Sequence, residues 1–359
     1  MALHEDHRDH ELQGDHRQDQ DQRGAPVEPA RHIAFEPLEH VALPLAKTLS
    51  RKARNMQDPQ PDFRPRPGEA ETLAPDLRRI VAPNPSPMTF RGTNTYLLGT
   101  RGLAVIDPGP DDLGHLDAIL SALTPGQRIT HVLVTHAHLD HSPLARPLAQ
   151  ATGAQVHAFG DAGAGRSGVM RKLARDGLLG GGEGVDAGFA PDVCLRDKDC
   201  VTGDGWQIEA LHTPGHFGNH LSFAWGDALF SGDLVMGWAS SLVSPPDGDL
   251  TDFMASLDRI AARSWSVLHP GHGAPIETPG ARIAELRVHR LNREAQILAA
   301  LEDGAADAAT LAARIYTDTP PALLPAATRN VLSHLLHMAR EGRVTAPAGL
   351  TENAIFQVT

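Results

Sequence analysis

The sequence predicts an α/β fold, in which short buried strands alternate with helices, followed by a smaller helical unit. Short apolar runs, such as residues 132–134 and 267–268, each precede a loop rich in histidine, aspartate, glycine or proline. Apolar residues at helical spacing lie between several of these runs, and from residue 280 onward the pattern becomes largely helical. Because sites in α/β proteins form at the loops beyond the strand ends, these loops are the candidate site.

The composition is typical of a soluble globular protein. The 359 residues suffice for one large domain or for two, and 41% of them are hydrophobic. A formal net charge of −12 argues against general affinity for nucleic acids or anionic membranes, although it leaves a local basic groove open. Since there is no run of about 18 apolar residues and no apolar N-terminal segment, we expect a cytoplasmic protein with no membrane partner. Cys194 and Cys200 form no CxxC pair and are expected to be incidental thiols.

Residues 1–70 are expected to form a disordered, low-complexity extension. Residues 1–24 are rich in acidic residues and histidine, and residues 25–70 are rich in proline without regular apolar spacing. The histidines of the first stretch offer an alternative interpretation as a weak metal-binding tract. They are His4, His7, His10 and His16.

The elements expected after residue 70 alternate between strands and helices. Ser142 and Pro143 are typical of an N-cap and a first helical position, so they predict a helix start there. The other predicted elements are a hairpin of residues 95–98 and 103–106, helices over 113–123 and 251–262, strands at 132–134, 155–158, 207–211 and 267–268, and a hairpin of 221–224 and 228–230.

Residues 160–190 are rich in glycine and are expected to form a mobile loop beside the site. They contain neither a P-loop nor a strand-coupled GxGxxG pattern, which argues against a phosphate cradle. Arg166, Arg171 and Lys172 are weak candidates for contact with an anionic substrate.

Residues 281–359 are expected to form a helical unit that resembles a winged helix. Helices are predicted over 283–301, 311–315 and 331–338, and a small strand or wing at 343–345. Eight arginines and seven acidic residues between 280 and 343 nearly balance, which is unfavourable for DNA binding. We therefore favour a role in shaping the substrate cleft or in forming a homodimer.

The heptapeptide from Thr135 to His141, with sequence THAHLDH, predicts a metal site. It places three histidines and one aspartate at a strand-to-helix junction. Three later loops add ligand-type side chains in similar positions, each after an apolar run. Five imidazoles and two carboxylates exceed the three or four ligands of a single zinc ion, so we infer two metal ions. The candidate ligands are His136, His138, Asp140, His141, His216, Asp233 and His272.

The motifs THAHLDH, TPGH, SGD and HPGHG, in this order, resemble those of the metallo-β-lactamase superfamily. This resemblance implies a four-layer αββα sandwich over residues 71–280, preceded by the extension and followed by the winged-helix-like unit. It also implies that His136, His138 and His216 hold one metal ion. Asp140, His141 and His272 would then hold the second ion, and Asp233 would bridge the two.

A narrower resemblance is to the lactamase-beta-like-2 group. It rests on NPSPMT at residues 84–89, GTNTY at residues 92–96, and the C-terminal unit with YTDTP at residues 316–320. That group includes a single-strand-selective endoribonuclease. The N-terminal extension, the 160–190 loop and residues 240–246 differ from the group. Thr93, Asn94 and Asn219 are weak candidates for substrate binding.

These observations predict a hydrolase that uses a metal-bridged hydroxide, with Asp140 as the catalytic group that orients the nucleophile and relays its proton. The first substrate class is a phosphodiester, such as single-stranded RNA. The alternative is a small-molecule ester or thioester, attacked by a thioesterase or lactonase of the hydroxyacylglutathione hydrolase type. A second alternative is a non-enzymatic, metal-dependent DNA-binding regulator. Zn²⁺ is the favoured metal, while imidazole and carboxylate ligands leave Mn²⁺ and Fe²⁺ open.

Overall fold

The computed structural model describes residues 58–178 and 184–359. The predicted N-terminal tail, including its four histidines, lies outside the described residues. Residues 58–69 contain no helix or strand, as expected for that stretch, but two of their side chains contact the rest of the fold. The side chain of Gln60 accepts a hydrogen bond from the backbone of Ala274, and the ring of Phe63 stacks on Phe90.

The first sheet has seven strands that are hydrogen-bonded in chain order. Its first four strands pair antiparallel, and its last four pair parallel, so the fourth strand belongs to both halves. The strands are β1 (Ala70–Ala74), β2 (Leu77–Val81), β3 (Asn94–Leu98), β4 (Gly102–Ile106), β5 (Arg128–Leu133), β6 (Gln155–Ala158) and β7 (Val193–Cys194).

The second sheet has five strands in the order β12-β11-β10-β9-β8. Its strands pair antiparallel except for β11 and β12, which are parallel because the α4 helix connects them. The strands are β8 (Cys200–Thr202), β9 (Gln207–His212), β10 (Leu221–Trp225), β11 (Ala228–Gly232) and β12 (Val267–Pro270).

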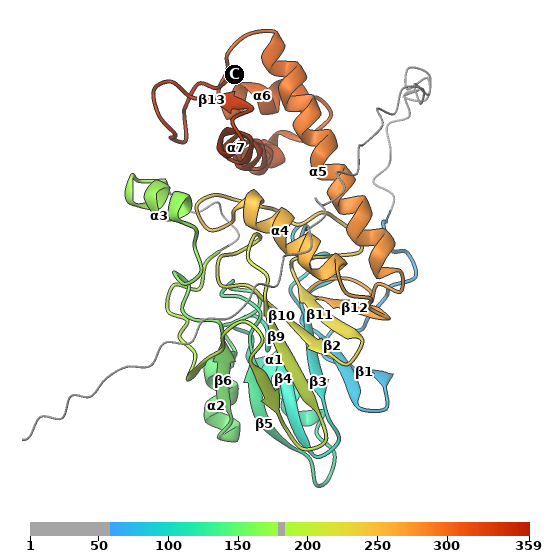
Figure 1. The fold of residues 1–359 in the computed structure, drawn as a ribbon. Coiled ribbons are helices and arrows are strands. Elements are labelled where there is room, and N and C mark those ends of the chain that lie inside the picture. Colours follow the sequence, from blue (N-terminus) through green and yellow to red (C-terminus); the bar gives the residue numbers. More distant parts are fainter. Residues whose placement is uncertain (1–57, 179–183) are drawn as a thin grey trace, which may run out of the picture. The chain divides into compact units, whose positions relative to one another are not determined.

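The two sheets pack face to face, and helices cover their outer faces (Figure 1). Alternate side chains of a strand point to opposite faces, so on β4 Ile106 joins the core between the sheets and Val105 packs under the helices. The helices α1 (Leu113–Ser121) and α2 (Ala145–Thr152) cover the first sheet. The second sheet is covered by α4 (Leu250–Ala261) and the start of α5 (Pro279–Glu302). The predicted four-layer αββα sandwich is therefore confirmed.

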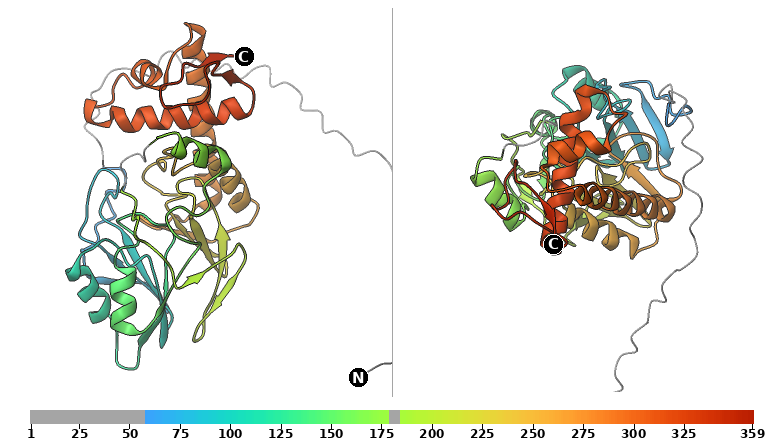
Figure 2. Two further views of the ribbon diagram at one scale, coloured as in Figure 1. Left: turned by 90° about the vertical axis from the view of Figure 1, so that its left-hand side faces the viewer. Right: turned by 90° about the horizontal axis from the view of Figure 1, so that it is seen from above.

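The C-terminal unit has a separate hydrophobic core, seen from two further sides in Figure 2. Besides the end of α5, its elements are α6 (Ala308–Ile315), a short 3₁₀ helix η1 (Pro321–Leu323), α7 (Leu324–Arg340), β13 (Val344–Thr345) and β14 (Gln357–Val358). The α7 helix also packs on α4, where His337 Nδ1 lies 2.9 Å from Thr251 Oγ1 and Arg340 lies 3.1 Å from the Asp249 carboxylate. The predicted helices and the small strand at 343–345 are all present.

Two local predictions differ from the structure. The helix after the heptapeptide begins at Ala145 rather than at Pro143, because the Ser142 hydroxyl bonds to His138 and Asp186 instead of capping the helix. The glycine-rich stretch contains α3 (Gly168–Arg175), whose Met170 and Leu173 are buried in the C-terminal core. Apolar residues at positions 170 and 173 have helical spacing, but the surrounding glycines obscure it. Among the described residues, no helix combines the length and the apolar character that a membrane span requires.

Candidate metal centre

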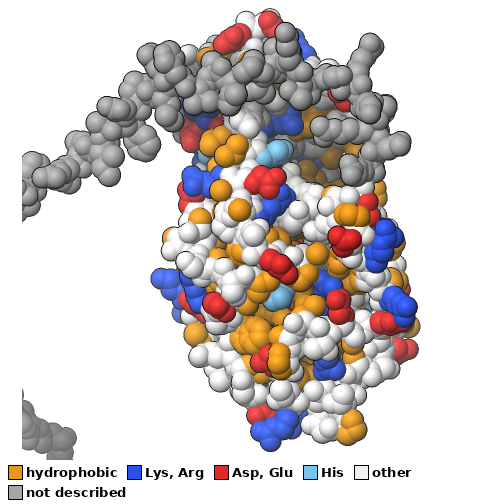
Figure 3. All heavy atoms as spheres, turned by 90° about the vertical axis from the view of Figure 1, so that its right-hand side faces the viewer, with side chains coloured by type: hydrophobic (Ala, Val, Ile, Leu, Met, Phe, Trp, Pro, Cys, Tyr) orange, Lys and Arg blue, Asp and Glu red, His pale blue; other side chains and the backbone are white. Residues whose placement is uncertain are grey.

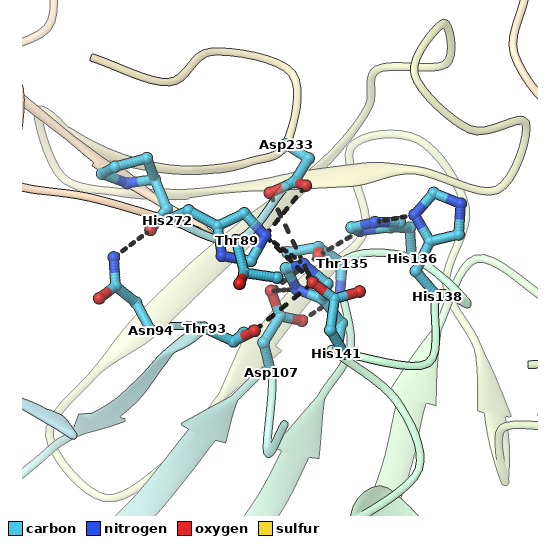
Figure 4. A network of polar contacts seen from close by, with 12 residues as sticks. Thr89, Thr93, Asn94, Asp107, Thr135, His136, His138, His141, Asp233 and His272 are labelled. Atoms are coloured by element: carbon cyan, nitrogen blue, oxygen red, sulfur yellow. Dashed lines mark hydrogen bonds and ion pairs between the residues drawn. The ribbon is translucent and has the colours of Figure 1, made fainter. Parts of the chain in front are cut away.

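All seven predicted ligands meet at one edge of the two sheets, in the loops beyond the strand ends. Figure 4 labels five of them, His136, His138, His141, Asp233 and His272. His136 to His141 follow β5, His216 follows β9, Asp233 follows β11, and His272 follows β12. Their donor atoms form three overlapping groups, each with its atoms within 4.8 Å of one another. The groups are His136 with His138 and His216, His136 with His141 and Asp233, and Asp140 with His141 and His272.

The first group consists of three imidazoles. His136 Nε2 lies 2.8 Å from His138 Nδ1, and His138 Nδ1 lies 3.1 Å from His216 Nε2. All three side chains are nearly inaccessible to solvent. Three ring nitrogens that lie this close together are suited to hold a divalent cation.

The group of Asp140, His141 and His272, called the second group from here on, combines one carboxylate with two imidazoles. An oxygen of Asp140 lies 3.1 Å from His272 Nε2 and 3.4 Å from His141 Nε2. Asp233 lies between the two groups, with its oxygens 3.3 Å from His272, 3.6 Å from His141 and 3.8 Å from His216. Residue 271 is glycine, and a Cβ atom at this position would lie 2.2 Å from Asp233 Oδ1. Glycine therefore leaves room for the Asp233 carboxylate.

Each histidine except His138 directs Nε2 toward the centre, because an acceptor binds its Nδ1–H. His141 Nδ1 donates to Asp107 at 2.9 Å, and His216 Nδ1 donates to the Leu242 carbonyl at 2.7 Å. The Thr135 hydroxyl donates to Asp107, so its oxygen accepts from His136 Nδ1 at 2.9 Å. His272 Nδ1 donates to the Gly92 carbonyl at 3.3 Å. Such partners fix the tautomer and the ring orientation of metal-binding histidines.

Four of the candidate histidines differ in their protonation state. Burial and the neighbouring imidazoles lower the pKa of His138 to about 3, and that of His136 falls well below its ordinary value for the same reasons. Burial also lowers the pKa of His272, but Asp233 and Asp140 outweigh it and raise this pKa to about 10. Nearby carboxylates likewise outweigh burial at His141 and raise its pKa well above the ordinary value. His136 and His138 are therefore neutral, whereas His141 and His272 carry protons that a metal ion would replace.

The donor set fits divalent metal ions. Imidazole nitrogens and carboxylate oxygens are the ligands of zinc, manganese and iron, and all the donors are buried or nearly so. The Asp233 Oδ1 atom is buried and has no hydrogen-bond partner among the described residues. A buried carboxylate oxygen without a partner is unfavourable, so a cation between the groups would satisfy it.

Comparison with known proteins agrees with this geometry. Residues 88–272, just over half of the chain, match the metallo-beta-lactamase superfamily domain. The chain belongs to the metallo-beta-lactamase superfamily. Residues 308–349 match the beta-lactamase associated winged helix domain, so the predicted winged-helix-like unit is confirmed as well.

Individual relatives place the chain near the predicted group within the superfamily. A Beta-lactamase-like protein 2 homolog from Drosophila melanogaster is 32% identical, covering 80% of this chain and 96% of that protein. The homolog from Caenorhabditis elegans is 30% identical, covering 77% of this chain and 88% of that protein. An Atrochrysone carboxyl ACP thioesterase from Passalora fulva is 32% identical, covering 65% of this chain and 64% of that protein. The chain is thus a metallo-beta-lactamase superfamily hydrolase similar to both kinds of protein.

Solved structures of this superfamily have the same fold. A beta-lactamase domain protein from Burkholderia ambifaria superposes with a TM-score of 0.70 at 22% identity, covering 84% of this chain and 96% of that chain. A metallo-beta-lactamase family protein from Thermus thermophilus gives a TM-score of 0.65 at 26% identity, covering 80% of this chain and all of that chain. Both matches extend beyond the residues of the superfamily domain alone.

The remaining histidines near the superfamily motifs have other partners. His220 Nε2 accepts a hydrogen bond from the backbone of Asp233 at 3.1 Å and so supports the loop that carries this carboxylate. The rings of His131, His212 and His269 each pack against aromatic side chains. None of these four belongs to a candidate metal group among the described residues.

Among the described residues, the three weak candidates for substrate binding are not part of the lining of the pocket beside the metal centre. Asn94 donates to the carbonyls of Pro270 and Gly273, and Asn219 donates to the carbonyls of residues 160 and 161. Thr93 Oγ1 lies 3.5 Å from the Asp140 carboxylate and is buried. We therefore assign Asn94 and Asn219 to the framework of the loops, and Thr93 to the orientation of Asp140.

Asp107 directly follows the predicted strand of residues 103–106 and was not among the predicted site residues. It has a left-handed backbone, with φ of 50°, and its buried carboxylate accepts from Thr135 N, Thr135 Oγ1 and His141 Nδ1. The sequence feature that could have marked Asp107 as a site residue is its position directly after a strand at this edge. The sequence DPGP at residues 107–110, however, is equally typical of a turn. Asp107 therefore orients both ends of the heptapeptide.

Replacing Asp107 with asparagine is expected to weaken metal binding by about 10–100-fold, as for other partners of ligating histidines. The amide nitrogen would face a donor in either orientation, because one carboxylate oxygen accepts from Thr135 N–H and the other from His141 Nδ1 and the Thr135 hydroxyl. Competition with a chromophoric chelator measures the affinity. Asp117→Asn on the exposed face of α1 is the matched control, and equal affinities in the two variants would contradict this role.

A pocket of about 260 Å³ opens onto the metal centre. Met88 and Leu139 at this pocket are large apolar side chains that remain 40% and 49% exposed. No lysine or arginine of the described chain lines it. Its lining consists of Ser86, Met88, Thr89, His138, Leu139, Asp140, Asp233 and His272.

Proposed function

We propose that the chain is a two-metal hydrolase of acyl esters or thioesters. The observation that carries this proposal is the pocket lining, in which exposed apolar side chains accompany the candidate ligands and no lysine or arginine occurs among the described residues. An acyl group offers apolar surface that Met88 and Leu139 can bury. A nucleic-acid backbone needs lysine or arginine, which this lining lacks.

A second pocket supports an apolar substrate that extends past the metal centre. Leu139 also lines a neighbouring pocket of about 670 Å³, whose apolar lining includes Val156 and Phe189. The cation in its lining, Arg146, is paired with Asp192 at 2.8 Å. The similarity to acyl carrier protein thioesterases points in the same direction.

The roles of the residues follow from their positions. His136, His138 and His216 would hold one ion, and Asp140, His141 and His272 the other, with Asp233 between them. Bound ions of this kind polarise the acyl oxygen and lower the pKa of water so that hydroxide forms near neutral pH. Asp140, whose side chain is 22% exposed, faces the pocket and is placed to hold a proton of the attacking water. Thr93 lies beside Asp140 and orients it.

Single-stranded RNA is the second candidate substrate. The similarity to Beta-lactamase-like protein 2 homologs over most of the chain favours it, because the resemblance to that group implies a ribonuclease. On the face drawn in Figure 3, basic and acidic side chains are interspersed rather than gathered into a basic stripe. This distribution, together with the pocket lining, makes RNA the weaker candidate.

A DNA-binding regulator receives less support from the C-terminal unit. The α7 helix is the longest helix of the winged-helix segment, and its residues 330–336 are all buried. A helix that reads a DNA groove must present exposed side chains to the bases. The α7 helix instead packs against the hydrolase domain.

A panel of acyl thioesters with chains of two to eight carbons tests the proposed substrate class. We expect kcat/KM to rise with chain length by up to about fourfold per methylene, since burying one methylene contributes about 0.8 kcal/mol. Leu139→Asp should flatten this dependence. Leu113→Asp is the matched control, because Leu113 is 69% exposed on α1 and lines neither pocket.

Two outcomes of this panel would reject the acyl substrate. One is metal-dependent cleavage of single-stranded RNA at a higher kcat/KM than any thioester, which would support the second candidate. The other is a dependence on chain length that is flat in the native protein. Loss of the dependence in Leu113→Asp as well would show that Leu139 has no specific role.

A further inference from the structure

The segment between β11 and α4 carries a backbone group that contacts the metal centre. The Leu242 carbonyl accepts a hydrogen bond from His216 Nδ1 at 2.7 Å, and His216 Nε2 points toward the other ligands. Because the acceptor is a main-chain oxygen, its position depends on what holds this segment. Residues 236–246, the β11–α4 segment, contain no helix or strand.

Arginines of the C-terminal helices hold the β11–α4 segment by its carbonyl oxygens. Arg282 of α5 donates to Met236 O at 2.8 Å and to Ala239 O at 2.7 Å. Arg290 of α5 donates to Ser241 O. Arg329 of α7 donates to Pro245 O at 2.8 Å. The bond to Ser241 O is made one residue before the carbonyl that contacts His216.

Arg290 lies in an unusual environment for a charged side chain. It is fully buried, and no carboxylate of the described chain lies within ion-pair distance of its guanidinium. Its Nη1 donates to Asn330 Oδ1 at 2.8 Å, and its guanidinium lies 4.9 Å from the centre of the Phe253 ring. Burying a cation without a carboxylate partner destabilises the folded state. We therefore expect the buried Arg290 to have a specific role.

We propose that Arg290 is a positioning residue for the metal centre, acting through the β11–α4 segment on His216. Arg290 anchors Ser241 O and with it the planar peptide that ends at Leu242 Cα, so the Leu242 carbonyl keeps only the φ and ψ freedom of its own residue. That carbonyl holds the Nδ1–H tautomer of His216 and leaves Nε2 for the metal. The C-terminal unit thereby sets the affinity of one of the two ions. This inference rests on the two-metal centre of the proposed function.

Arg290→Met removes the donor and keeps much of the side-chain volume. We expect one of the two Zn²⁺ equivalents to bind about 10–100-fold more weakly, as when other partners of ligating histidines are lost. The other equivalent should change by less than about threefold, since it does not involve His216. Stepwise competition with a chromophoric chelator measures both affinities, and the visible spectrum of the Co²⁺-loaded protein reports the ligand geometry directly.

Arg314→Met is the matched control. Arg314 also donates to a backbone carbonyl in the C-terminal unit, that of Ala300, but it lies outside the β11–α4 segment. A thermal melt of each metal-free variant separates folding from metal binding. Arg290→Lys, which retains one donor, should restore part of the affinity.

The outcomes distinguish failure of the Arg290 positioning role from failure of the proposed two-metal function. Two unchanged Zn²⁺ affinities in a folded Arg290→Met would overturn the positioning role and leave the metal centre standing. If Arg290→Met does not fold, Asn330→Ala, which removes the partner of the guanidinium, takes its place, and unchanged affinities there would overturn the role equally. A native protein that binds no Zn²⁺ would reject the proposed function itself.

Discussion

Asp233→Asn is expected to lower the turnover of any substrate of this hydrolase by about 10³-fold, which corresponds to about 4 kcal/mol of transition-state stabilisation. The Asp233 carboxylate lies within 3.8 Å of imidazoles from both ligand groups. Asparagine has the same shape but lacks the charge, and its amide would face the cations. The loss should therefore affect both ions and appear mainly in kcat.

The measurement combines initial rates with elemental analysis of protein purified without chelators. We expect about two metal equivalents in the native protein and fewer than one in Asp233→Asn. Asp227→Asn, at the turn between β10 and β11, is the matched control because Asp227 is an exposed residue of the same hairpin. Native-like turnover in Asp233→Asn would contradict a bridging carboxylate.

Removal of the metal ions is expected to abolish hydrolysis and to destabilise the fold. Without cations, the protonated His141 and His272 must pair with the buried carboxylates, and Asp233 Oδ1 lacks a hydrogen-bond partner among the described residues. Free metal at a thousandfold its Kd stabilises the folded state by about 4 kcal/mol. The corresponding rise in Tm is about 5 °C for a chain of this size.

Thermal melts with and without chelator test this expectation, and titration with Zn²⁺, Mn²⁺ and Fe²⁺ identifies the metal that restores activity. Asp233→Asn should show little of this rise in Tm. A Tm that is the same with and without metal would mean that the histidine cluster does not bind ions in the folded state.

The local sequence was sufficient to locate the candidate ligands and most of the sandwich. The heptapeptide and the TPGH, SGD and HPGHG motifs each follow an apolar run, and the structure brings all seven ligand side chains together. Continuous apolar runs, as on β4, whose five residues are all buried, and Gly/Pro-rich loops are properties of neighbouring residues. For this reason strands such as residues 155–158 were predicted with their observed bounds.

Other elements left a weaker local signal. The β1 and β2 strands (Ala70–Ala74 and Leu77–Val81) follow the proline-rich extension, and α3 is surrounded by glycines. Burial of Met170 and Leu173 against the C-terminal core stabilises α3, and this partner lies more than 100 residues away in the sequence. Tertiary packing overrides weak local propensity in such segments.

Only the tertiary structure decided how the ligands are oriented and what faces the substrate. The hydrogen bond between Asp107 and His141 joins residues 34 positions apart in the sequence, and that between Arg290 and Ser241 joins residues 49 positions apart. The contact from Leu242 to His216 uses a main-chain carbonyl, which any residue type provides, so no sequence pattern marks it. The sequence by itself determined which donor atoms are available and in which loops, because these depend on residue type and local periodicity. Their directions, the pocket lining and the task of the C-terminal arginines depend on contacts between distant segments, which only the packed fold brings together.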